Sequence, residues 1–152
     1  MEKKYKLTEE TINVNGKTLY RIKALKDFAN IKKGDKGGFI ENESNLSQRG
    51  DCWVYGNAQV RGNTQVFGNA WVYGNAWVYD DAKVYDDASV YGYAQVSGNA
   101  QVFGNAQVYD DAEVYGNAQV YDDAEVYDNA KICDNAQVYG DAMVYGNTKI
   151  GD

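Results

Sequence analysis

The acidic side chains are the groups in this chain that most readily suggest chemistry, because several of them occur as adjacent pairs. Asp pairs stand at positions 80/81, 86/87, 110/111 and 122/123. Hard cations such as Ca²⁺ bind several carboxylate and carbonyl oxygens, so a pair of this kind could bind Ca²⁺ weakly. Asp is also a preferred turn residue. We therefore expect the pairs to be solvated turn residues and predict no metal site.

Catalysis is disfavoured by what the chain lacks. The 152 residues contain no His, which is the usual general base near neutral pH. Asp or Glu could replace it only if burial or a neighbouring charge raised the pKa of the carboxyl group, and turn positions offer neither. The sequence also shows no nucleophile–base pair, phosphate-binding loop or metal-spaced cluster. We predict no catalytic residue and no cofactor.

A six-residue repeat positions these side chains. Every sixth residue from Val54 to Ile150 is Val or Ile, at 17 positions in one phase, and a small residue, most often Ala, stands two places before each. The consensus unit is Val-Tyr-Gly-Asn-Ala-Gln. In a strand the aliphatic and the small residue share one face, Gln and Tyr share the other, and the Gly-Asn or Asp-Asp pair forms a turn. Stacked coils can bury the aliphatic face, whereas an α-helix would spread it around its whole surface.

This pattern resembles the hexapeptide repeat of left-handed parallel β-helices. The resemblance implies an all-β, left-handed, triangular solenoid in which three hexapeptide units, eighteen residues, make one coil, and we assign it to residues 39–152. Cys52 then lies at an inward position and Cys133 at an outward one. They are about four coils, or roughly 20 Å, apart, so both are expected to be free thiols.

Residues 1–38 are predicted to form a small β-rich cap. Asn15-Gly16 between two apolar stretches indicates a β-hairpin, with residues 5–7 as a further short strand. Leu25, Phe28 and Ile31 could pack beneath the hairpin. The repeat itself begins at Ile40 and Leu46, and the next step of eight residues to Val54 predicts a two-residue bulge at positions 48–50.

A second resemblance covers residues 20–60. It rests on the segments Ile22-Lys23-Ala24-Leu25-Lys26-Asp27-Phe28, Gly37-Gly38-Phe39-Ile40, Asn45-Leu46-Ser47-Gln48 and Trp53-Val54-Tyr55-Gly56-Asn57-Ala58. These are similar to the YdcK-like hexapeptide-repeat proteins of bacteria and phages, a group with no settled activity. The resemblance therefore implies a fold and not a function.

Sorting the outward residues by coil gives continuous aromatic ladders on two of the three faces. The first candidate binding face consists of Tyr55, Tyr73, Tyr91, Tyr109, Tyr127 and Tyr145, and the second of Phe67, Tyr85, Phe103, Tyr121 and Tyr139. The third column is mixed and contains Cys133. Trp53, Trp71 and Trp77 occupy the other outward position. One corner reads Asn57, Asn75, Tyr93, Asp111, Asn129 and Asn147, a ladder that Tyr93 interrupts.

Stacked rings can stabilise the coils, and exposed aromatic strips can also mark a contact surface. We predict a non-catalytic scaffold that self-associates as a dimer or trimer, or binds a protein or glycan, through a flat face or the uncapped C-terminal coil. The alternatives are an acyltransferase, which the hexapeptide resemblance implies but which normally uses a His, and an acidic decoy that imitates nucleic acid.

Charge and hydropathy limit which kinds of partner and which cellular location we expect. Residues 1–49 hold 11 Lys and Arg against 7 Asp and Glu, whereas residues 50–152 hold 4 against 15. The acidic repeat region argues against direct binding of nucleic acid, which needs clustered Lys and Arg. No apolar run is long enough to span a membrane or to form a signal peptide, so we expect a cytoplasmic protein.

Overall fold

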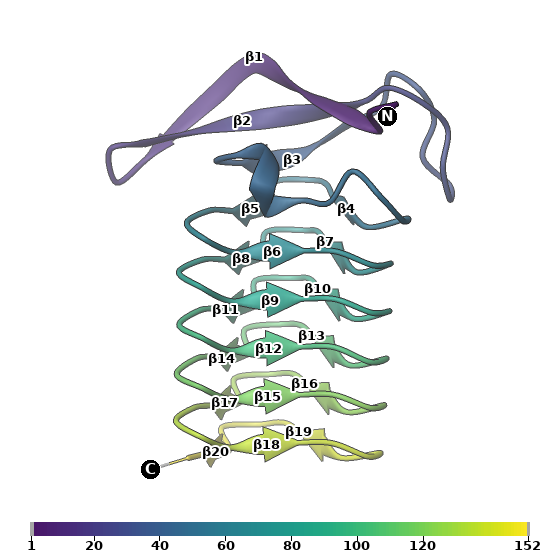
Figure 1. Ribbon diagram of the computed structural model, residues 1–152. Helices are drawn as coiled ribbons and strands as arrows, with labels where there is room; N and C mark the ends of the chain where they lie inside the picture. Colours follow the sequence, from purple (N-terminus) through teal and green to yellow (C-terminus); the bar gives the residue numbers. More distant parts are fainter. Residues whose placement is uncertain (1, 152) are drawn as a thin grey trace.

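Each six-residue unit folds into a two-residue strand followed by a turn, as the computed structural model of residues 2–151 shows (Figure 1). The side chain of the first strand residue points outward and that of the second is buried in all but the final strand. The strands are β4 (Trp53–Val54), β5 (Gln59–Val60), β6 (Gln65–Val66), β7 (Trp71–Val72), β8 (Trp77–Val78), β9 (Lys83–Val84), β10 (Ser89–Val90), β11 (Gln95–Val96), β12 (Gln101–Val102), β13 (Gln107–Val108), β14 (Glu113–Val114), β15 (Gln119–Val120), β16 (Glu125–Val126), β17 (Lys131–Ile132), β18 (Gln137–Val138), β19 (Met143–Val144) and β20 (Lys149–Ile150).

Three parallel sheets run along the length of the solenoid. Every third strand pairs in register, so that Val54 lies beside Val72 and Val72 beside Val90. The prediction that three hexapeptide units make one coil is therefore confirmed. The β4–β19 sheet, the β5–β20 sheet and the β6–β18 sheet are named here by their first and last solenoid strands. The left-handed sense of winding stays a prediction from the resemblance.

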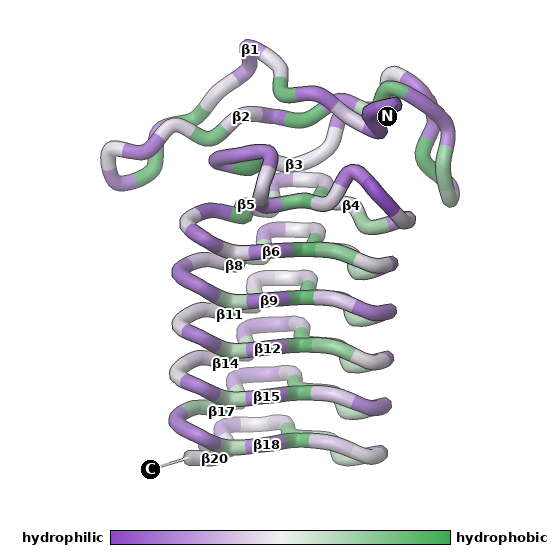
Figure 2. Tube along the Cα trace, viewed as in Figure 1, coloured by the Kyte–Doolittle hydropathy of each residue, from purple (hydrophilic) through white to green (hydrophobic). Residues whose placement is uncertain are grey.

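The core is built from the aliphatic residue and the small residue of every unit. From Val54 to Ile132 the aliphatic side chains are 0–1% exposed, and the Ala residues between them are fully buried. Apolar residues recur at the same place in successive coils (Figure 2). Burial of an aliphatic side chain contributes about 1.5–3 kcal/mol, so the repeated Val supplies the main drive for stacking.

The cap continues one of these sheets. β1 (Tyr5–Val14) and β2 (Lys17–Ala24) form the predicted hairpin around Asn15-Gly16, with β1 longer than the short strand expected at residues 5–7. β3 (Lys36–Ile40) pairs antiparallel with β2 and parallel with β5. Because β3 spans the predicted boundary at residues 38/39, cap and solenoid share one nine-stranded sheet.

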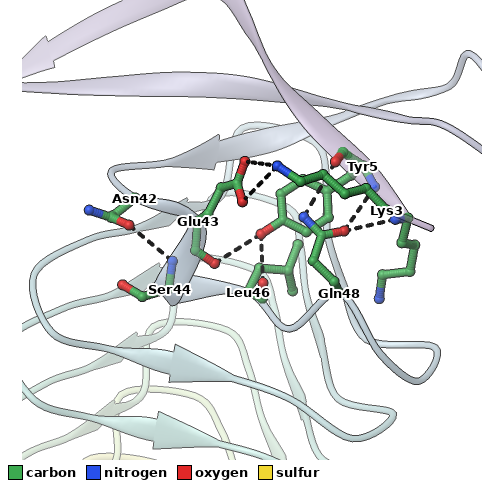
Figure 3. Close-up of polar contacts among 8 residues, drawn as sticks. Lys3, Tyr5, Asn42, Glu43, Ser44, Leu46 and Gln48 are labelled. Atoms are coloured by element: carbon green, nitrogen blue, oxygen red, sulfur yellow. Dashed lines mark hydrogen bonds and ion pairs between the residues drawn. The ribbon is translucent and has the colours of Figure 1, made fainter. Parts of the chain in front are cut away.

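The bulge before β4 receives the N-terminal segment. Leu46 pairs with Val66, whereas Trp53 pairs with Trp71, so the first pairing spans two more residues of chain than the second, and the predicted insertion is confirmed. Tyr5 Oη lies 2.6 Å from the Leu46 carbonyl, and the Gln48 side chain accepts hydrogen bonds from the backbone of Lys4 and Tyr5 (Figure 3). The short 3₁₀ helix η1 (Glu43–Asn45) precedes this contact and is capped by Asn42.

Trp53 occupies the predicted outward position, but the cap covers it completely. Its ring packs edge-on against Phe28 at 5.1 Å and Tyr5 at 6.2 Å between centroids. Ile31 is also buried and Leu25 is half-buried. Trp53 therefore belongs to the core that joins cap and solenoid, and of the three Trp only Trp71 and Trp77 remain on outer faces.

Candidate binding faces

The predicted tyrosine ladder lies on the β4–β19 sheet, and its rings stack face to face. Each Tyr follows the Val of its strand, so the register between coils places successive rings directly above one another. The centroids are 4.7–5.5 Å apart and neighbouring ring planes differ by 3–17°. The ladder Tyr55, Tyr73, Tyr91, Tyr109, Tyr127 and Tyr145 is called the Tyr face below.

Hydroxyl groups of this ladder bind the next coil. Tyr91 Oη donates to Gln107 Oε1 at 3.0 Å, and Tyr109 Oη donates to Glu125 Oε1 at 2.8 Å. Burial raises the pKa of Tyr109 well above its usual value, and the Glu125 carboxylate, which accepts its proton in a hydrogen bond, raises it further. The ring faces and the hydroxyl groups therefore both join adjacent coils.

The second predicted ladder lies on the β6–β18 sheet. The rings of Phe67, Tyr85, Phe103, Tyr121 and Tyr139 are stacked with centroids 4.8–5.5 Å apart. Tyr85 donates to Gln101 at 3.0 Å and Tyr121 to Gln137 at 3.2 Å. The two ladders thus share one construction, and each is available as a flat aromatic strip.

Both aromatic faces carry very little charge. Among the outward strand residues and ladder residues of the β4–β19 sheet the charged side chain is Glu125, and among those of the β6–β18 sheet it is Lys83. The remaining acidic residues of the solenoid lie mainly at its corners. A partner that packs on either face therefore meets rings, amides and hydroxyl groups.

The column on the β5–β20 sheet is mixed, as predicted. Arg61 stacks over the Tyr79 ring at 4.5 Å, and Ser97 follows in the next coil. Cys133 occupies the outward position but is only 2% exposed, and a Cβ on Gly151 would meet its Sγ at 2.6 Å. Cys52 and Cys133 are both free thiols, as predicted.

The first Asp of each acidic pair, and Asp128 in the Asp-Asn turn, lie at corners and bind the next coil. Asp80, Asp86, Asp110, Asp122 and Asp128 all have positive φ, and the carboxylate of each accepts a hydrogen bond of 3.0–3.2 Å from a backbone N–H one coil later. In residues 2–151 no three acidic or Cys side chains converge as metal ligands would. The periodicity alone did not reveal these hydrogen bonds.

The sequence did not predict that Lys4 is a buried cation. Lys4 is 1% exposed, and its Nζ donates to the carbonyl groups of Gly50 and Cys52 at 3.2 and 2.6 Å. Burial lowers the pKa of Lys4, while the nearby Cys52 opposes that shift. The sequence carried no signal for this contact, because Lys4 lies outside the repeat.

Fold and faces together define a parallel β-solenoid protein with two aromatic ladders. The family model described as the YdcK beta solenoid repeat matches residues 64–80, 94–110, 106–122 and 136–152. The chain is thus similar to YdcK-like β-solenoid repeat proteins, in agreement with the second resemblance. No curated protein matches the sequence significantly. Across the described residues, no helix has the length and apolarity that crossing a bilayer requires.

Proposed function

We propose that this protein is a non-catalytic scaffold that pairs with a second copy of itself through the Tyr face. The observation that carries the proposal is a continuous, nearly uncharged ladder of six stacked Tyr on a chain with a net charge of −7. Aromatic residues supply contact area with little loss of conformational entropy on binding. The cytoplasm remains our proposed location, and the two free thiols support it.

The regular repeat of one Tyr per coil on the Tyr face favours a second copy of the chain, rather than a different protein, as the binding partner. In a two-fold dimer each surface must complement itself. Two ladders with the same coil spacing present equivalent groups to each other along their whole length. Acidic corners, where like charges would repel, lie outside the strip.

Sedimentation velocity across a range of concentrations tests the proposal with Gln107→Glu. This substitution keeps an oxygen acceptor for Tyr91 and copies the Tyr109–Glu125 pair of the next coil, although it places the new carboxylate beside Glu125. It places a second carboxylate on the Tyr face. We expect the dimer dissociation constant to rise at least about tenfold, because a charge must be desolvated or repelled at the interface.

Gln101→Glu is the matched control on the other ladder. Gln101 accepts the same 3.0 Å hydrogen bond from Tyr85. Its strand neighbour is Lys83, whereas that of Gln107 is Glu125, so urea unfolding of both variants is measured as well, which separates a local loss of stability from a loss of dimer. We expect this variant to dimerise like the unmodified chain. A monomer at all concentrations, or a dimer that Gln101→Glu weakens as much as Gln107→Glu, would overturn the proposal.

A further inference from the structure

A groove runs beside the corner that joins the β4–β19 sheet to the β5–β20 sheet, on a side that neither aromatic ladder occupies. Two rows of side chains line the part of the groove nearer the cap, which has a volume of about 460 Å³. The corner row contains Asn57, Asn75, Tyr93 and Asp111, and the strand row contains Gln59, Trp77, Gln95 and Glu113. A second hollow of about 560 Å³ shares Asp111 and Glu113 and continues toward Lys149.

Two aromatic residues in this groove depart from the repeat. Tyr93 stands where the neighbouring coils have Asn or Asp, and Trp77 stands where they have Gln. Their exposed fractions are 64% and 37%, respectively. The Tyr93 side chain has no ring or hydrogen-bond partner within residues 2–151, unlike the ladder rings. Stacking between coils therefore does not account for Tyr93.

Hydrogen-bonding groups of both kinds surround these rings. Gln59 Oε1 is buried without a hydrogen-bond partner in the described chain. Gln95 Oε1 accepts from Tyr79 Oη at 3.3 Å, which leaves the amide NH₂ of Gln95 to donate. Asn57 and Asn75 add further amides, and the carboxylates of Asp111 and Glu113 add acceptors at the far end.

We propose that this groove binds a linear, uncharged oligosaccharide along the solenoid axis. The C–H face of a pyranose ring packs on an exposed aromatic ring, while its hydroxyl groups both donate and accept hydrogen bonds, which matches amides and carboxylates. The residues that line the stretch from Asn57 to Gln95 are uncharged, and the nearest cation is Arg61, whose guanidinium lies 5.5 Å from the centre of the Trp77 ring. Coils about 4.8 Å apart also offer repeated partners to a polymer with a similar repeat.

Two other polymers fit the groove less well. A peptide strand adds to a sheet through free backbone groups, but the backbone N–H groups of Gln59, Trp77 and Gln95 are already bonded to the next coil at 2.9–3.0 Å. A nucleic acid would bring phosphates toward the carboxylates of Asp111 and Glu113. The cations near the groove are Arg61 at Trp77 and, beyond Glu113, Lys131 and Lys149, which are too scattered for the clustered charge that phosphates need. The proposal does not depend on dimerisation, because the Tyr face lies on another sheet.

The test is titration of the ¹⁵N-labelled full chain with cellohexaose, chitohexaose, xylohexaose and maltohexaose, followed by nuclear magnetic resonance and calorimetry. The three Trp give three indole N–H signals, and Trp77→Gln identifies the one from the groove. We expect at least one hexasaccharide to shift the Trp77 signal while the buried Trp53 signal stays in place. Hexagalacturonate is the charged comparison and is expected to bind more weakly.

Tyr93→Asn and Trp77→Gln then test the groove itself. Each variant restores a residue that this chain uses at the same place in another coil, such as Asn75 or Gln95, so folding is preserved. We expect each to weaken binding at least about tenfold, which corresponds to about 1.4 kcal/mol. Trp71→Gln, on the β4–β19 sheet, is the matched control and should bind as before.

Several outcomes would overturn the proposal. These are no binding of any neutral hexasaccharide at millimolar concentration, binding of hexagalacturonate alone, or unchanged affinity in both groove variants. Displacement of a bound hexasaccharide by an unrelated peptide at equal concentration would also count against it. Loss of dimerisation in Gln107→Glu with saccharide binding intact would separate this inference from the proposed scaffold function.

Discussion

At each corner of the solenoid a single residue must adopt the turn conformation, and an Asp there also accepts a hydrogen bond from a backbone N–H of the next coil. Asp86 has a φ of 57°, in the left-handed region that costs most residues about 1–2 kcal/mol. Its carboxylate accepts the N–H of Gly104 at 3.1 Å. The hydrogen bond and the tolerance of Asp for this conformation explain why Asp alternates with Gly at these positions.

Substitution of Asp86 separates these two effects. Asp86→Ala keeps a Cβ at positive φ and removes the acceptor, so we expect it to lower the free energy of unfolding by about 1–2 kcal/mol. Asp86→Gly removes the acceptor but relieves the backbone strain, and should cost less than the Ala variant. Urea unfolding followed by circular dichroism measures both. Equal stability of the two variants would show that backbone strain at Asp86 is negligible.

The environment of a repeat residue could not be predicted where the N-terminal cap packs against it. The period correctly places Trp53 and Cys133 on the outward side of their coils. It does not report that Phe28 and Tyr5 cover Trp53. That contact depends on how the non-repeating N-terminal segment folds back, and no local pattern encodes it. The contact of Cys133 with Gly151, by contrast, follows from the register of Ile132 with Ile150.

At the scale of the strand, the ladders were predictable because register fixes them. Once three hexapeptide units make one coil, Tyr73 must lie beside Tyr91, and the rings stack at 4.8 Å. The hydroxyl contacts were not predictable, because side-chain conformation decides whether a ladder residue reaches the strand residue of the next coil. The groove was missed for the same reason, although Tyr93 was visible as an interruption of the Asn corner.

The ladders also predict how stability depends on pH. Burial raises the pKa of Tyr55, Tyr73, Tyr85, Tyr91 and Tyr109 in the folded chain. Unfolded Tyr ionises near pH 10, so above that pH the unfolded chain binds fewer protons than the folded one and folding loses free energy. We expect the contribution of these Tyr to stability to be constant up to about pH 9 and to fall as pH rises beyond about 10.

Tyr109→Phe isolates the contribution of the ladder from that of titrating Lys. Phe is tolerated in a stacked ladder, as Phe103 shows between Tyr85 and Tyr121. The variant should therefore fold and lose stability less steeply above pH 10, in urea unfolding curves recorded at several pH values. An unchanged slope would mean that Tyr109 ionises alike in the folded and unfolded chains, contrary to its environment beside Glu125.

For the whole molecule, each coil contacts only the coils next to it, so stability is a sum of neighbouring interfaces. The cap closes one end with Trp53, Lys4 and the Tyr5 hydroxyl. At the other end of the described chain, Ala142 and Met143 are exposed and Ile150 is half-buried, whereas one coil earlier Ala124 and Ile132 are fully buried and Glu125 is half-buried. Opening should therefore begin at the last coil and progress toward the cap.

Hydrogen exchange followed by mass spectrometry checks this gradient. We expect amides in the coil of residues 137–150 to exchange fastest and those in residues 95–120 to be protected by several coils on either side. Tyr5→Phe removes the hydroxyl that lies 2.6 Å from the Leu46 carbonyl. In that variant we expect faster exchange in residues 46–66 and unchanged exchange in residues 101–126, because a local loss at one interface does not reach distant coils. If all coils instead lost protection together, the solenoid would be unfolding as one cooperative unit, and the additive description of its stability would be wrong.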